Sequence, residues 1–215
     1  KIPIYEPGLE EYLKRNIETQ RLKFRDNIVE AIHENEVIFI AVGTPSNDDG
    51  DVDLSQVEEV AVKIAENLNG YKLVVIKSTV PIGTTEKLSK KFKIHICHNP
   101  EFLREAHAYE DVMNPDRIII GQCCPEHGKL LISLYSPLKK PIYVTSSKTS
   151  ETVKLLSNSY LAMLITFWNE ASELCKQLGL DIREVANLVC ADRRMSRYGT
   201  RKFGEAFGGK CLPKD

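Results

Sequence analysis

The chain alternates short, β-branched apolar runs with amphipathic stretches, and this alternation limits the folds it can adopt more than any other feature. The runs at 36–45 and 71–83 end in turn residues, so we predict buried strands with exit loops. Between them, residues 53–68 carry apolar side chains at helical spacing, with Asp53 as the expected N-cap. Further strands are predicted at 93–98, 117–121 and 141–145. The pattern predicts an α/β fold with a Rossmann-like, mostly parallel sheet covered by helices on both faces.

A second feature is the run from Lys148 to Leu178, which contains no glycine or proline. At a rise of 1.5 Å per residue, a helix of about thirty residues is about 45 Å long, more than one small sheet can cover. We therefore expect two domains, 1–146 and 147–215, the second an all-α dimerisation domain. The homodimer, or larger homo-oligomer, would bury the apolar residues of this helix: Leu155, Leu161, Leu164, Ile165, Phe167 and Trp168.

Composition excludes several classes of protein. The formal net charge of −1, with lysines and arginines spread along the chain, offers no basic surface for nucleic acid. No run approaches the ~18 apolar residues that a membrane helix needs. The six cysteines follow no CxxC or zinc spacing, so we expect free thiols in a reducing cytoplasm.

The two ends of the sequence suggest a fragment. A dinucleotide-binding fold usually opens with a strand and a GxGxxG turn, and no GxGxxG occurs in this chain. The first residue is Lys1 instead of methionine, and the chain stops at Asp215, just after its most distinctive segment. We expect a sheet that is incomplete at its N-terminus.

That distinctive segment is "FGGKCLPKD" (207–215). Cys211 could be one more buried thiol, which is the usual state of a free cysteine. Alternatively, the preceding glycines allow close approach of a substrate, and Lys210 and Lys214 could lower the thiol pKa, so that Cys211 acts as a nucleophile. The segment by itself leaves both readings open.

Two pairs of polar residues are spaced four apart. In "NPEFLREA" (99–106), a helical turn would bring Glu101 and Glu105 onto one face, although a solvated surface with Arg104 fits the spacing equally. In the long helix, Lys154 and Asn158 could together bind an oxyanion, or could simply be exposed.

Hydroxyl residues follow the first two predicted strands, at Thr44 and at Ser78-Thr79, where they could bind phosphate or ribose or cap helices. His95, Cys97 and His98 also follow one another closely. Because His95 and Cys97 would share one strand face and His98 the other, we predict no metal site from these three.

Taken in order, the segments resemble the UDP-glucose/GDP-mannose dehydrogenase family along essentially the whole chain. They are "PIYEPGLEEYL", "VGTP", "KSTVPIGTTEKL", "NPEFLREA", "NPDRIIIG", "KLLSNSYLAMLITFWNEASELC" and "FGGKCLPKD". The resemblance implies that 1–146 is part of an NAD-binding domain and that 147–215 is the central dimerisation domain. It also implies an NAD-dependent oxidation of a nucleotide sugar's C6 alcohol to a carboxylate, through a thiohemiacetal and a thioester on a catalytic cysteine, Cys211.

The resemblance further implies roles for individual residues. Lys154 and Asn158 would stabilise oxyanions, Thr79 and Asp215 would hold water, and Glu101 would assist proton transfer. The residues implied to line the NAD pocket are Val42, Gly43, Thr44, Pro45, Ser78, Thr79, Glu105 and Lys214. Those implied around the sugar nucleotide are Glu101, Phe102, Leu103, Lys154, Asn158, Arg194, Lys202, Phe207 and Gly208. The family's Asp-x-Arg-Ile segment appears here as "ADRRM" (191–195), so Arg193 is an alternative to Arg194.

UDP-glucose is the expected substrate, because the form "GGKCLPKD" looks closer to the UDP-glucose and GDP-mannose branches than to the N-acetyl branch. GDP-mannose and UDP-N-acetylhexosamines are the alternatives within the family. Outside enzymology, the chain could be an inert dimerisation or binding module. Retention of Cys211, Lys154, Asn158, Glu101 and Asp215 together argues for the enzyme.

Overall fold

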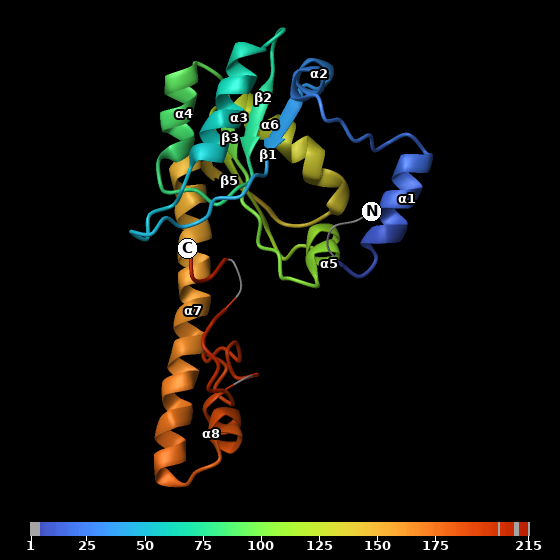
Figure 1. Cartoon of the computed structure of the whole chain (residues 1–215). Coiled ribbons are helices and arrows are strands. Elements are labelled where there is room, and N and C mark those ends of the chain that lie inside the picture. Colours follow the sequence, from blue (N-terminus) through green and yellow to red (C-terminus); the bar gives the residue numbers. More distant parts are fainter. Residues whose placement is uncertain (1–4, 202, 209–210, 215) are drawn as a thin grey trace. The chain divides into compact units, whose positions relative to one another are not determined.

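The computed structural model describes residues 5–201, 203–208 and 211–214. The chain divides into two compact units, Lys1–Lys154 and Leu155–Asp215, called here unit 1 and unit 2. Figure 1 gives the order of the elements along the chain.

Unit 1 is built on a five-stranded sheet in the order β1-β2-β3-β4-β5. The first three strands run parallel to one another, as do β4 and β5, while β3 and β4 are antiparallel and pair only through His98 and Gly121. The mostly parallel sheet is confirmed, but the reversal between β3 and β4 was not predicted. The strands are β1 (Val37–Ile40), β2 (Leu73–Ile76), β3 (Ile96–His98), β4 (Ile118–Gln122) and β5 (Ile142–Ser146).

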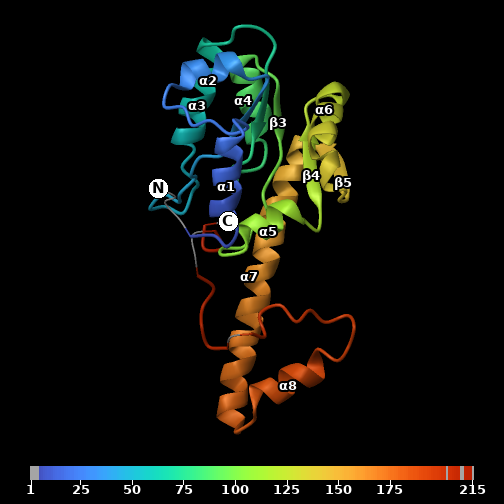
Figure 2. The ribbon, with the colours of Figure 1, turned by 90° about the vertical axis from the view of Figure 1, so that its right-hand side faces the viewer.

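Helices cover both faces of the sheet (Figure 2). Three helices pack on one face against Val74, Ile76 and Ile96, and α6 packs its Leu131 on the other face. The helices of the first face are α2 (Ile28–Glu34), α3 (Ser55–Glu66) and α4 (Thr84–Phe92). The remaining helices of unit 1 before α7 are α1 (Leu9–Glu18), α5 (Ala108–Met113), α6 (Pro125–Tyr135) and the short 3₁₀ turn η1 (Ser136–Leu138).

The start of α3 differs by one residue from the sequence prediction. Leu54 is the N-cap, and Asp53 stands one position earlier, where its Oδ1 accepts a hydrogen bond from the backbone N–H of Ser55 at 2.8 Å. Asp53 as the N-cap was therefore wrong, although its carboxylate still pairs with an N–H that the helix leaves unbonded.

The long helix α7 (Ser147–Leu178) begins in unit 1, where one side of its first turns is buried at Ser147, Ser150, Glu151 and Lys154. Glu151 is fully buried and binds the start of α4. Its carboxylate accepts hydrogen bonds from Gly83 N at 2.6 Å, Thr85 N at 2.8 Å and the Thr85 hydroxyl at 2.6 Å. A carboxylate at a helix N-terminus satisfies unbonded N–H groups and interacts favourably with the helix dipole.

The backbones of β4 and α7 approach closely at Gly121. A Cβ placed on Gly121 would lie 2.7 Å from Ser150 Cβ, 2.8 Å from Ser147 Cα and 3.2 Å from His98 Cβ. Only glycine fits between the sheet and the first turn of α7 without displacing one of them.

Unit 2 contains the rest of α7 and the helix α8 (Ile182–Val189). Its core joins Trp168, on α7, to Ala186 and Cys190, with Phe203 packed against them. Trp168 is only 2% exposed. The prediction that Trp168 belongs to a dimer interface was therefore wrong, because Ala186, Cys190 and Phe203 of the same protomer cover it.

Other apolar side chains of α7 remain exposed in this protomer. They form what we call the α7 stripe, which follows the helical repeat on one side of the helix. Its members are Leu156, Tyr160, Met163, Phe167, Leu174 and Leu178. Within the part of the chain that is described, no helix has the length and apolar character needed to cross a membrane.

Candidate active site

Polar side chains gather at the carboxyl ends of β2 and β3 in unit 1. Lys77 follows β2, and its ammonium donates to the Asn99 carbonyl at 3.2 Å, to Asn99 Oδ1 at 3.0 Å and to the Pro100 carbonyl at 3.3 Å. Burial lowers the pKa of Lys77 to about 8. A lysine with such a pKa can exchange a proton near neutral pH, which is typical of functional sites in open α/β sheets.

Asn99 holds this edge of the sheet in place. Its Nδ2 donates to the carbonyl of Ile119 on β4 at 2.7 Å, and its Oδ1 also accepts from the hydroxyl of Tyr135. Burial raises the pKa of Tyr135 to about 12, so the phenol stays protonated as a donor.

Glu101 and Lys154 form an ion pair, with Lys154 Nζ 3.0 Å from Glu101 Oε1. The Lys154 side chain is only 4% exposed. The other carboxylate oxygen of Glu101 accepts the backbone N–H of Leu103 at 2.6 Å, and the Lys154 ammonium lies 5.4 Å from the ring centroid of Phe102. The structure thus joins two side chains that are 53 positions apart, and it rules out an exposed Lys154.

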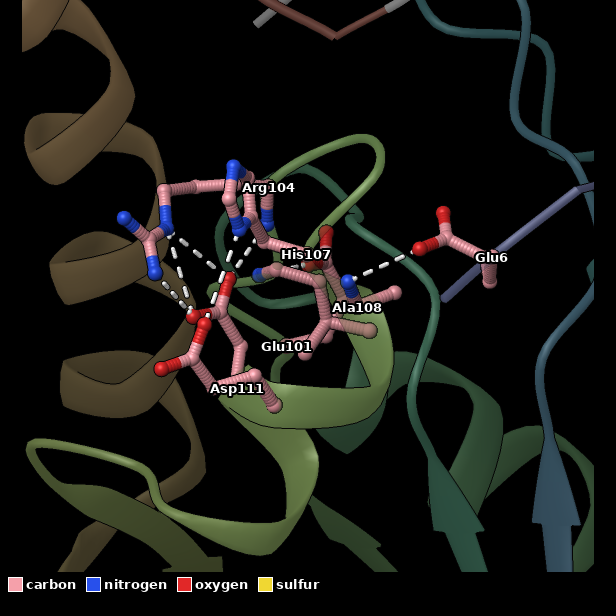
Figure 3. Close-up of polar contacts among 8 residues, drawn as sticks. Glu6, Glu101, Arg104, His107, Ala108 and Asp111 are labelled. Carbon is pink, nitrogen blue, oxygen red and sulfur yellow. Dashed lines mark hydrogen bonds and ion pairs between the residues drawn. The ribbon is translucent and has the colours of Figure 1, made fainter. Parts of the chain in front are cut away.

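The loop that carries Glu101 is held by ion pairs and backbone contacts (Figure 3). Arg104 binds the Asp111 carboxylate through both Nε and Nη2, and the hydrogen bond from Arg104 lowers the pKa of Asp111. Glu6 accepts the backbone N–H groups of Ala106 and Ala108, each at 3.1 Å.

Residues 101–107 are not helical. The predicted helical turn that would bring Glu101 and Glu105 onto one face is therefore wrong. Glu105 is exposed on this loop, while Glu101 turns inward to Lys154.

The loops after β1 and β2 are tied to each other. The Ser78 hydroxyl donates to the Val42 carbonyl at 2.6 Å, and the Thr44 hydroxyl donates to the Thr79 carbonyl at 2.9 Å. These two hydroxyls therefore hold together the loops at the carboxyl ends of β1 and β2.

The same edge is open to a ligand at its glycine. Gly43 and Pro45 are exposed, and a Cβ on Gly43 would meet nothing closer than the Gln56 side chain at 3.9 Å. Ligands of open α/β sheets bind at the carboxyl ends of the strands, so a ligand can approach this edge at Gly43.

Several candidate residues belong to unit 2. Asn158 is 8% exposed, so the alternative of a helix-surface asparagine is also wrong. Cys211 is exposed and begins a turn in which its carbonyl accepts the N–H of Lys214 at 3.1 Å. Exposure is the state that a nucleophilic thiol needs, and the role of Cys211 stays a prediction.

The remaining unit 2 candidates lie nearby in the sequence. Phe207 is half-buried and Gly208 is exposed, with no atom within 4 Å of a Cβ placed on it. Arg194 pairs with Asp192 at 2.6 Å. Lys202 and Asp215 lie outside the described residues.

His98 belongs to neither group of candidates. It is fully buried, its Nδ1 is 2.8 Å from Ser150 Oγ, and burial lowers its pKa to about 4, so it remains neutral at physiological pH. His95 and Cys97 contact other partners, His127 and Cys123.

Sequence reasoning missed Lys77, Asn99 and Tyr135 as members of the site. A signal for Lys77 was available, since it is the first charged residue after a buried β2 run and must therefore lie at the carboxyl edge of the sheet.

The sequence of residues 1–139 matches the NAD binding domain of the UDP-glucose/GDP-mannose dehydrogenase family, and residues 148–215 match the central domain of that family. The chain belongs to this family. Gly43 and Lys77 both lie within the part of the chain that matches the NAD binding domain.

Individual relatives agree with this assignment. The chain is 40% identical to the UDP-glucose 6-dehydrogenase TuaD of Bacillus subtilis (strain 168), covering 100% of this chain and 48% of the relative. It is also 40% identical to a UDP-glucose 6-dehydrogenase of Rhizobium meliloti, covering 100% of this chain and 52% of the relative. The chain therefore spans about half the length of the curated relatives it matches.

Solved structures give the same result. A UDP-glucose dehydrogenase from the archaeon Pyrobaculum islandicum superposes with a TM-score of 0.95 at 40% identity, covering 100% of this chain and 52% of that one. A GDP-mannose dehydrogenase from Pseudomonas aeruginosa, solved as a ternary complex, superposes with a TM-score of 0.85 at 36% identity, over 100% and 52% of the two chains.

Proposed function

We propose that the protein to which this chain belongs is a nucleotide-sugar 6-dehydrogenase, with UDP-glucose as its substrate and UDP-glucuronate as its product. The observation that carries the proposal is the ion pair between the buried Lys154 and Glu101, which lies at the carboxyl edge of the family's NAD-binding domain. A structural role alone does not require a lysine at this position, because burying an ion pair seldom adds net stability.

NAD would lie along the edge formed by Gly43, Pro45 and the Ser78-Thr79 loop, with Glu105 and Lys214 as further members of the pocket. When bound, it supplies the acceptor for a hydride in each of two successive oxidations. The two hydroxyl-to-carbonyl bonds of Ser78 and Thr44 fix this edge before the cofactor arrives.

Cys211 would act as the nucleophile. Its thiolate adds to the C6 aldehyde formed in the first oxidation, giving a thiohemiacetal that is not released. Oxidation of the thiohemiacetal gives a thioester, and water then attacks its carbonyl carbon. The C–S bond breaks, the carboxylate leaves and the thiol of Cys211 is regenerated.

The charged residues would stabilise and move charge in these steps. The Lys154 ammonium and the Asn158 amide stabilise the oxyanions at C6. Glu101, within 3.0 Å of Lys154, accepts and returns protons through the lysine or through water held by Thr79 and Asp215. Phe102, Leu103, Arg194, Lys202, Phe207 and Gly208 would surround the sugar nucleotide.

The exposed α7 stripe supports a homodimer as the working form of this enzyme. The free cysteines of the described residues suit a reducing cytoplasm, which we propose as its location.

The experiment uses the full-length protein with NAD⁺ and a panel of nucleotide sugars, counting NADH formed per sugar consumed. We expect two NADH for each UDP-glucose, with GDP-mannose and UDP-N-acetylhexosamines consumed more slowly. Cys211→Ser should abolish steady-state acid production while the protein stays folded, because a serine hydroxyl is protonated near neutral pH and is a far poorer nucleophile.

The matched control is Cys175→Ser, which changes a buried thiol of α7 and should retain turnover per folded molecule. Near-normal kcat in a folded Cys211→Ser variant would refute the mechanism. If the wild-type protein oxidises none of the nucleotide sugars, the proposed function is wrong and the alternative of an inert module is favoured.

A further inference from the structure

A second group of reactive side chains lies in unit 1, on the sheet face that α6 covers. Cys97 Sγ, on β3, lies 3.5 Å from Cys123 Sγ, just after β4. His127 Nδ1, in the first turn of α6, lies 3.0 Å from Cys123 Sγ and 2.9 Å from Cys124 Sγ. His95 precedes β3, and its ring centroid is 4.7 Å from that of His127. Three thiols and two imidazoles thus converge from β3, the β4–α6 turn and α6.

Three of these side chains have the spacing of metal ligands. One ligand atom each from His95, Cys123 and His127 lies within 4.8 Å of the other two. In a tetrahedral zinc site, Zn–S bonds of about 2.3 Å and Zn–N bonds of about 2.0–2.1 Å place ligand atoms roughly 3.3–3.8 Å apart. The side chains therefore need only small rotations to enclose one ion.

The surroundings favour a site that an ion can enter. His95 and Cys123 are exposed, while His127 is buried and fixed at the base. Tyr71 packs against both imidazoles, with its ring centroid 5.5 Å from that of His127 and 5.9 Å from that of His95. Tyr71 therefore limits the orientations of both rings, as the residues around a metal site do.

The chemistry of the ligands selects the kind of ion. Thiolate and imidazole are soft or borderline ligands that suit Zn²⁺, whereas Mg²⁺ and Ca²⁺ require oxygen ligands. Cys97 and Cys124 each lie in contact with one of the three ligands, so either thiol can supply a fourth.

We propose that His95, Cys123 and His127 bind one thiophilic cation of the Zn²⁺ type. This site is separate from the Glu101–Lys154 pair and does not depend on the proposed dehydrogenase activity.

The position of the site indicates what the ion would do. β3 and β4 pair through a single residue pair, where the sheet changes from parallel to antiparallel. An ion held by His95 before β3 and by Cys123 after β4 would bridge this weakly paired seam. Its effect would be on the stability of the sheet, since no candidate residue for hydride transfer belongs to the cluster.

The test uses the full-length protein, reduced and stripped with a chelator, and the probes are Zn²⁺ and Co²⁺. Equilibrium dialysis should find one Zn²⁺ per chain, and Zn²⁺ should raise the melting temperature. Co²⁺ should produce thiolate-to-cobalt charge-transfer absorption and the intense visible bands of a tetrahedral site, which Zn²⁺ displaces.

Variants then assign the ligands. Cys123→Ser and His95→Gln should each weaken Zn²⁺ binding by at least about 100-fold, since even changes in residues behind the ligands cost 10–100-fold. His95 is exposed, so its variant should fold normally even if Cys123→Ser does not. Cys175→Ser, a buried thiol of unit 2, is the matched control and should bind as the wild type does.

Two results would overturn the proposal. One is the absence of cobalt charge-transfer bands in the reduced wild-type protein, which does not depend on any variant folding. The other is a thiol count that falls short until a reductant is added, with no Zn²⁺ bound after reduction. That result would mean that two thiols of the chain form a disulfide and that the reduced cluster does not bind the ion. Activity enters neither result, so the failure of this proposal is distinct from the failure of the proposed function.

Discussion

The low pKa of Lys77 predicts a specific pH dependence of stability. Its pKa is about 8 in the folded protein, against an ordinary value of 10.5, because burial disfavours the ammonium. Below pH 8 the ammonium is present in both states, and the folded state bears the full cost of burying it. Between pH 8 and 10.5 the unfolded chain binds more protons, so the free energy of unfolding rises with pH in this window.

The size of the effect follows from the shift. A difference of about 2.5 pKa units at 1.36 kcal/mol per unit is about 3 kcal/mol. Of the neighbours, the Glu101 carboxylate raises the pKa of Lys77 and the Lys154 ammonium lowers it, both less than burial does. The phenol of Tyr135, which shares Asn99 Oδ1 with Lys77, titrates at about 12, above the window.

The perturbation is Lys77→Met, measured by urea unfolding from about pH 7 to 10.5 alongside the wild type. Methionine keeps the aliphatic stem but has no proton to titrate. The variant also lacks the three hydrogen bonds that Lys77 donates to carbonyl groups. This loss lowers its free energy of unfolding by the same amount at every pH. The wild type should therefore gain about 3 kcal/mol relative to the variant across the window, while the matched variant Lys63→Met, at an exposed lysine, should show no such gain.

Thiols and other lysines titrate in the same range, but they are common to both proteins and cancel in the difference. A difference between wild type and Lys77→Met that stays flat, or that falls as the pH rises, would refute the assigned pKa.

Two further predictions concern packing. Gly121→Ala should lower the free energy of unfolding by about 1–3 kcal/mol, because its Cβ has no room against α7. Gly208→Ala is the control and should be nearly neutral, since a Cβ there meets no atom within 4 Å. Urea unfolding compares the two variants, and equal midpoints would contradict the close approach of β4 and α7. Phe167→Asp, in the exposed α7 stripe, should convert the dimer into a monomer, which sedimentation at micromolar concentration would detect. An obligate interface buries more than about 2,000 Å², and an unpaired charge inside it is strongly destabilising. Glu170→Lys, an exposed change on the same helix, is the control, and a wild type that sediments as a monomer would remove the dimer.

Local patterns predicted the elements well. The strands and α7 were predicted because periodicity and the absence of glycine and proline are properties of neighbouring residues. The direction of a strand is not such a property, so the antiparallel pairing of His98 with Gly121 could not be read from the sequence.

The candidate site was harder, since its contacts join distant positions. Glu101 was grouped with Glu105 by spacing, but the chain there is an irregular loop fixed by Arg104 and Asp111, and the actual partner is Lys154. Trp168 was assigned to a dimer interface because helical spacing identifies an apolar face but not the residues that cover it.

The cluster of His95, Cys97, Cys123 and His127 shows the same limit of sequence-based prediction. His95 and Cys97 were weighed only with His98, their neighbour in sequence. Their actual neighbours, Cys123 and His127, come from the turn after β4 and from α6, which only the folded sheet brings beside β3.

The buried carboxylate of Glu151 has a consequence for ligand binding. Glu151 lies one turn before Lys154 on α7, and its three hydrogen bonds to the start of α4 fix the rotation of the helix about its own axis. The ammonium of Lys154 is therefore aimed at Glu101 in the absence of any ligand. A free lysine side chain has about 2 kcal/mol of rotamer entropy to lose. Here folding has already removed that freedom, so a substrate that contacts Lys154 would be bound by a preorganised cation.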